Sequence, residues 1–115
     1  MPSYLVQGYV RIIPAVPGFD VVMEALNRHG AHLTGGSLDP SGTRAAISER
    51  IKTGSREAAV GAVTGRLRGA EERRQRIDHE IRFSVGPFVA ELVSELLPDG
   101  SLGPRRSWPP AADDG

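Results

Sequence analysis

The stretch from Tyr4 to Asn27 constrains the fold most, because a strand, a turn and a helix follow one another within it. Apolar residues alternate with other residues from Tyr4 to Ile13, which predicts a strand with one apolar face and with Gly8 at its centre. Pro17-Gly18 follows the strand, and proline cannot donate a hydrogen bond to a sheet. From Phe19 to Gly30 the apolar period is helical, and glycine is a common helix stop. We therefore expect a β-α unit here.

The rest of the chain predicts five further strands and helices and one turn. They are a weak strand at 31–38, a turn at 39–42, a strand at 43–53, a helix from Ser55 to Arg68, a strand from Ile77 to Val85 and a helix from Phe88 to Leu97. This order predicts the α+β class, as a ferredoxin-like βαββαβ sandwich with an additional C-terminal helix. We expect one domain over residues 1–97. Residues 98–115 are rich in Pro, Gly and Asp and are expected to form a disordered tail.

The composition narrows the function classes. Fourteen basic and fourteen acidic side chains balance, so the overall charge predicts neither a nucleic-acid nor a membrane partner. Cysteine is absent, which excludes disulfides and thiolate chemistry. No apolar run reaches the roughly 18 residues of a membrane helix, and no catalytic, nucleotide-binding or metal-binding motif is found. We therefore expect a cytoplasmic protein without metal, cofactor or catalytic residues.

The segment VPGFDVVMEALNRHGAHL, with a strand before it and a hairpin after it, resembles ACT-type regulatory domains. Such domains share the expected fold, a Pro-Gly pair at the first strand-to-helix turn and a small residue after the helix-ending glycine. The resemblance covers about residues 6–85. It implies a small-molecule site, for an amino acid, between this turn and a neighbouring subunit, at Pro17, Gly18, Phe19 and Asp20. The alternative interpretation is a turn that only ends a strand.

Two polar residues, Glu49 and His79, lie on the apolar faces of their expected strands, and both strands would flank the first strand at Gly8. Burying either group unpaired costs several kcal/mol. We therefore expect them to approach each other, or a shared water, as part of a ligand site or as a structural pair. The alternative is that each is solvated near a strand end. His29 and His32 have a metal-like spacing, but a glycine between them ends the helix, so we expect no metal site there.

Small residues gather on one side of the expected second helix, opposite its apolar stripe. They are Ala58, Gly61, Ala62, Gly65 and Gly69. Each interior glycine costs about 1 kcal/mol relative to alanine, which suggests that another helix packs closely there. The alternative is an exposed face without a partner. The expected helix at 88–97 also carries six large apolar side chains that need cover. We expect a homodimer through Ala58, Gly61, Ala62, Gly65 and this helix.

The second face of the first expected strand is mixed in character, whereas polar and basic residues line that of the strand at 43–53. In the first strand this face carries Leu5, Gln7, Tyr9, Arg11 and Ile13, and in the strand at 43–53 it carries Arg44, Ser48, Arg50 and Lys52. The second face of the first strand is therefore expected to be only partly covered.

Three functions remain open. The first is a non-enzymatic homodimeric module that senses a small molecule. The second is a cofactor-independent enzyme of the dimeric α+β-barrel type, with a cavity lined by His79, Glu49 and Tyr9 or Tyr4. The third is a protein-interaction adaptor that uses the strand at 31–38 or Arg105-Arg106. A cavity near Gly8 would favour the enzyme, and a crevice at Pro17-Gly18 would favour the sensor.

Overall fold

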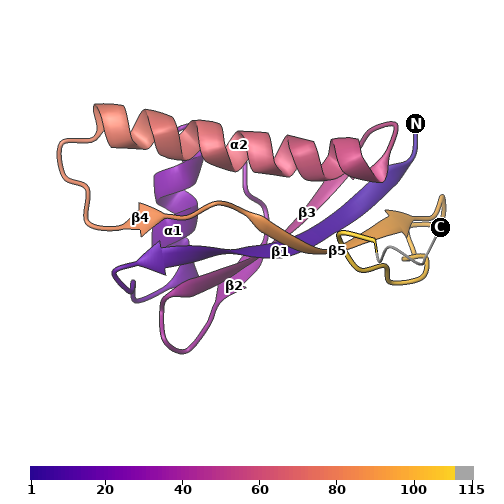
Figure 1. The fold of residues 1–115 in the computed structure, drawn as a ribbon, viewed down its shortest axis with the longest axis horizontal. Helices are drawn as coiled ribbons and strands as arrows, with labels where there is room; N and C mark the ends of the chain where they lie inside the picture. The colour runs from indigo at the N-terminus through magenta and orange to yellow at the C-terminus, as the bar shows by residue number, and fades with distance from the viewer. Residues whose placement is uncertain (111–115) are drawn as a thin grey trace.

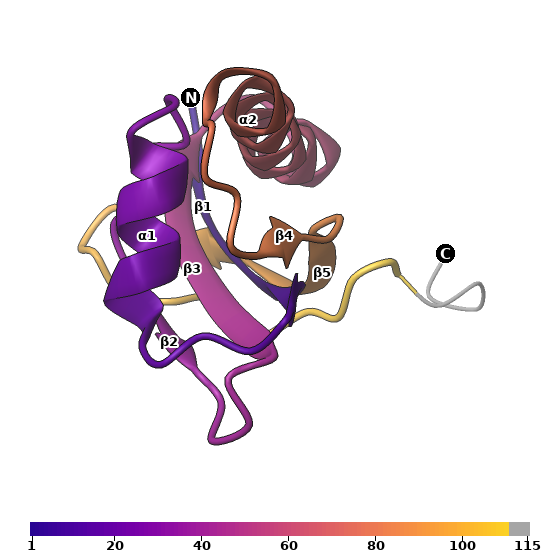
Figure 2. The ribbon, with the colours of Figure 1, turned by 90° about the vertical axis from the view of Figure 1, so that its left-hand side faces the viewer.

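An antiparallel sheet of five strands carries two helices on one of its faces in the computed structural model, which describes residues 1–110 (Figures 1 and 2). The elements are β1 (Ser3–Ile13), α1 (Phe19–Asn27), β2 (Gly36–Leu38), β3 (Arg44–Lys52), α2 (Arg56–Ile77), β4 (Ser84–Val85) and β5 (Val89–Leu96). The strand order is β2-β3-β1-β4, and β5 also pairs with β1. This confirms the α+β class. Within this described range, neither helix combines the length and the apolar content that a membrane span needs.

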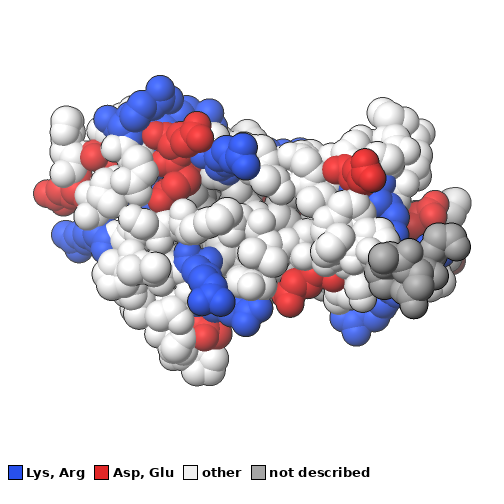
Figure 3. All heavy atoms as spheres, in the orientation of Figure 1, with Lys and Arg blue, Asp and Glu red and all other residues white. Residues whose placement is uncertain are grey.

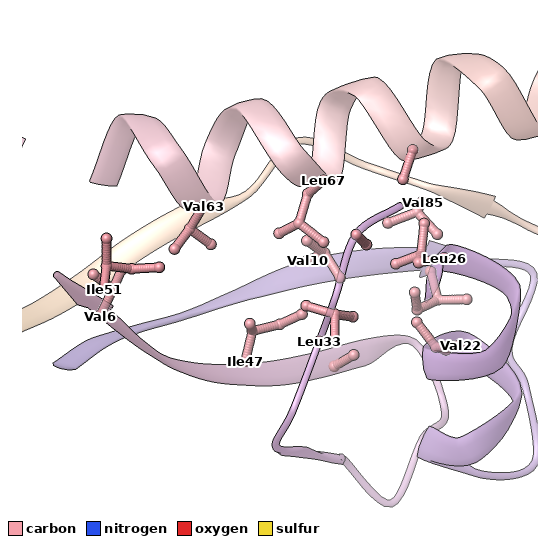
Figure 4. Packing of buried hydrophobic residues seen from close by; sticks show 14 of the residues in the cluster. Val6, Val10, Val22, Leu26, Leu33, Ile47, Ile51, Val63, Leu67 and Val85 are labelled. Atoms are coloured by element: carbon pink, nitrogen blue, oxygen red, sulfur yellow. The ribbon is translucent and has the colours of Figure 1, made fainter. Parts of the chain in front are cut away.

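The core lies between the sheet and the two helices (Figure 4). Alternate residues of β1 and β3 point into it, including Val6, Val10 and Ile47, because successive strand side chains point to opposite faces. The helices contribute Leu26 from α1 and Leu67 from α2, among others. The strand and helix predicted between Tyr4 and Asn27 are confirmed in position and type.

Helix α2 is longer than expected, and most of the strand expected from Ile77 to Val85 is wrong. The charged run after Arg68 continues the helix because two of its side chains bind the chain that enters β4. The Arg74 guanidinium donates to the Glu71 carboxylate at 2.7 and 3.0 Å and to the carbonyl of Phe83 at 2.7 Å. The same carboxylate accepts the N–H of Val85 at 2.8 Å. Only Ser84–Val85 is a strand.

The helix expected at 88–97 is also wrong, because Val89–Leu96 forms strand β5. Its register with β1 shifts between Gln7 and Gly8, where a β-bulge interrupts the pairing. A bulge moves the alternation by one residue, so apolar side chains no longer follow a two-residue period. The remaining spacing fits a helix, and only pairing with β1 decides for the strand.

The segment after β5 returns along this strand, whereas the sequence predicted disorder from residue 98. The N–H of Val93 donates to the carbonyl of Arg106 at 2.9 Å, and the N–H of Trp108 donates to the carbonyl of Glu91 at 2.8 Å. Isolated bridges join Leu92 to Ser107 and Leu96 to Leu102. The backbone of 101–108 therefore covers the outer edge of β5. Residues 111–115 of the predicted tail lie outside the described residues.

Candidate functional site

The Pro-Gly turn joins β1 to α1, and its neighbours serve packing. Gly18 caps α1 in an extended conformation that any residue can adopt. The ring of Phe19 lies on β2, where a Cβ at Gly36 would come within 2.5 Å of the ring atom Cζ. Asp20 is exposed in the first turn of the helix. Ligand binding at Pro17, Gly18, Phe19 and Asp20 stays a prediction.

The structure does not bring Glu49 and His79 together. Glu49 is buried on β3, and its carboxylate accepts hydrogen bonds from the N–H and the hydroxyl of Thr34, the former at 3.0 Å. These bonds fix the chain between α1 and β2 to β3. His79 is exposed in the connection between α2 and β4. Their expected approach is therefore wrong, because His79 lies in the exposed connection that follows α2 and not on a strand beside β1.

The space around Gly8 is filled by side chains. A Cβ at Gly8 would lie 2.7 Å from the ring atom Cζ of Phe88, so the glycine allows this ring to pack on β1. The hollow beside Glu49 is too small to hold a water molecule, since the volume open to one is ≈ 0 Å³. Tyr4 is buried in the core, whereas Tyr9 lies on the other face of the sheet. The polar groups named for an enzyme therefore do not meet in a cavity.

His29 faces a carboxylate at the end of α1. Its Nε2 atom is buried and lies 3.4 Å from the Oδ1 atom of Asp78, which follows α2. Its carbonyl accepts from Arg73 at 2.9 Å, so this corner joins the two helices. His32 is exposed. Within residues 1–110, no group of three or more acidic, histidine or cysteine side chains is arranged to hold a metal ion.

The small-residue side of α2 faces open space at two positions. A Cβ at Gly61 or Gly65 would meet no atom within 4 Å. A homodimer through this side stays a prediction. The second half of that expected interface, a helix at 88–97, does not exist, since these residues form β5.

One face of the sheet carries no helix, and we call it the open face (Figure 2). Its apolar side chains follow β1 and β5. They are Leu5, Tyr9 and Ile13 of β1 and Val89, Leu92 and Leu96 of β5. Ile13 is 71% exposed and Val89 is 43% exposed. The mixed character expected for this face of β1 is thus found on a surface without cover from the helices.

Basic side chains form the other half of the open face. Arg44, Arg50 and Lys52 project from β3 on this side, and Arg11 of β1 lies directly opposite Arg44. The guanidinium of Arg44 stacks on the ring of Tyr9 at 3.5 Å and lies 3.8 Å from the carboxylate of Glu91. Over α2, acidic and basic atoms lie side by side (Figure 3).

Two hollows flank Arg11 and Ile13 where β1 ends. The first, of ≈ 260 Å³, is also lined by Pro14, Asp39 and Arg44. The second, of ≈ 340 Å³, is lined on its far side by residues 84–87 and by Val89. An exposed apolar side chain thus stands between two recesses with arginines at their rim. Sequence reasoning placed Arg11 and Ile13 on this face but could not find the recesses, because the break between β4 and β5 makes one of them.

Comparisons with protein-family models, curated proteins and solved structures found no match.

Proposed function

We propose that the protein is a non-enzymatic interaction module that binds another polypeptide through the open face of its sheet. The observation that carries this proposal is the apolar row along β1 and β5, which ends in Ile13 at 71% exposure and Val89 at 43% exposure. Contiguous apolar side chains on a sheet face mark protein contacts more often than isolated ones do. This is the adaptor function, with a different surface from the strand at 31–38 or Arg105-Arg106.

The proposal includes a ferredoxin-like topology. β4 pairs with Ile12–Ile13 and β5 pairs with Ser3–Tyr9, so both occupy the same side of β1 at successive positions. Taken as one interrupted strand, they give the order in which β1 and β3 are central and both helices cover one face. The ACT-type resemblance is compatible with this topology.

A small-molecule sensor is the second candidate. It is favoured by the two hollows at Arg11 and Ile13, which are large enough for a small ligand and contain guanidinium donors. Its site would then lie at the end of β1 on the open face.

The interaction function is tested by photo-crosslinking of the full chain. A benzoylphenylalanine at Ile13 reports on the open face, and one at Arg76 reports on an exposed position of α2 away from its small residues. Each variant is irradiated alone, to detect a second copy, and in an extract of the producing cells, to detect another polypeptide. Adducts at Ile13 without adducts at Arg76 are expected. Equal yields at both positions, or none at Ile13, would contradict the proposal.

A further inference from the structure

The open face has a charge that the whole chain does not have. Four basic side chains, Arg11, Arg44, Arg50 and Lys52, project on this side, and Glu91 reaches it through its contact with Arg44. Asp39 lines the recess beside Arg11 and Arg44, so four positive charges stand against two negative charges and leave an excess of two. Residues 1–110 as a whole carry the same excess, with fourteen basic and twelve acidic side chains. The other surfaces of residues 1–110 are therefore balanced in charge, and the excess lies on the open face.

Arg11 and Arg44 concentrate positive charge at one end of the open face. The two residues are direct partners in the β1–β3 register, and like charges opposite each other destabilise a sheet. Stacking on Tyr9 holds one guanidinium in place over the face. A carboxylate bound between the two arginines would relieve their repulsion and accept charge-assisted hydrogen bonds.

The apolar row lies next to this basic row. Side chains of the row, such as Leu5 and Leu92, offer contacts to apolar groups, and the hollows beside Ile13 offer recesses for them. A segment that fits both rows carries acidic side chains toward β3 and apolar side chains toward β1 and β5. Electrostatic complementarity of this kind selects partners and raises association rates.

We infer that the open face binds an acidic, apolar polypeptide segment of another protein. A second copy of this chain fits less well, because its open face would bring a further excess of two positive charges against the first. This inference rests on the proposed interaction function and names the chemistry of its partner.

The test is a titration of the isotope-labelled full chain, followed by the chemical shifts of its backbone amides. The probe is an acetylated and amidated peptide of alternating Glu and Leu residues, as long as β1. Two matched peptides replace every Glu by Lys or every Glu by Ser. The variants Arg11→Gln and Arg44→Gln are compared with Arg76→Gln, whose exposed arginine lies on α2.

The Glu peptide is expected to shift amides of β1, β3 and β5 and to bind more tightly than the Ser peptide, whereas the Lys peptide should not bind. Each open-face substitution should weaken binding about three- to fivefold, and added salt should weaken it further. Arg76→Gln should leave the affinity unchanged.

Two results would overturn the inference while leaving the interaction function intact. One is binding to the open face with equal affinity for all three peptides. The other is a concentration-dependent dimer in light scattering whose contact maps to this face. Peptide-induced shifts confined to other surfaces, or none with any peptide, would contradict the inference and the interaction function together.

Discussion

The buried pair of Arg74 and Glu71 gives the sharpest prediction about the fold. Arg74 is 2% exposed, and its guanidinium holds the Glu71 carboxylate and the carbonyl of Phe83 and stacks on the Phe83 ring at 4.5 Å. The substitution Arg74→Met keeps a long apolar chain but removes these donors. It leaves a carboxylate in a site where only the N–H of Val85 and the amide of Gln75 still donate to it.

The expected cost follows from the burial of these groups. Removing one partner of a buried ion pair costs about 3–5 kcal/mol, because the other charge stays without compensation. With a slope of about 1.5 kcal/mol per molar urea, the unfolding midpoint should fall by about 2–3 M. In the double variant Glu71→Leu/Arg74→Met no buried charge remains, so it should be at least as stable as Arg74→Met. Its loss relative to the parent reflects the unpaired backbone groups of Phe83 and Val85.

Urea unfolding followed by circular dichroism measures these differences. Arg76→Met is the matched control, since it makes the same change at an exposed position of α2 and should alter stability by less than about 0.5 kcal/mol. Amide spectra of Phe83 and Val85 show whether the loss is centred on β4. A loss below about 1 kcal/mol for Arg74→Met, or one equal to that of the control, would refute the reasoning.

Three further predictions concern single positions. Gly8→Ala should cost about 1–3 kcal/mol in thermal unfolding, because the new methyl group meets the Phe88 ring and nearby backbone, and unchanged stability would show that β5 yields freely. Ser55→Ala should cost about 1 kcal/mol, since its hydroxyl accepts the N–H of Ala58 at 3.1 Å, and Ser55→Asp should retain the cap; equal losses would argue against capping. The hydrogen bond from the Ser41 hydroxyl lowers the pKa of Asp39. The stabilising contribution of this carboxylate is therefore present above its unfolded-state pKa and is lost as the pH falls through its folded-state pKa. An NMR titration that gives a raised pKa for Asp39 would contradict this.

The sequence by itself determined the first half of the fold. The two-residue period from Tyr4 to Ile13 and the helical period after Phe19 are local, and each agrees with the turn residues beside it. Strand β3 was found for the same reason. For each of these elements, the pattern of its own residues is enough to predict a strand or a helix.

The tertiary structure alone decided the second half. Helix α2 runs to Ile77 because Arg74 and Glu71 bind the chain that enters β4. Their partners Phe83 and Val85 lie nine and fourteen positions further along the chain, so a local sequence pattern does not show these contacts. Residues 89–96 form a strand because they pair with the edge of β1 that β3 does not occupy. The bulge at Gly8 interrupts the alternation of their apolar and polar side chains, so the sequence pattern does not indicate a strand. The candidate site also depends on this strand pairing, since the open face is formed by β1, β3 and β5 together. Sequence patterns show which face of a strand is apolar or basic, but only pairing between distant strands shows which of those faces lie together and which stay uncovered.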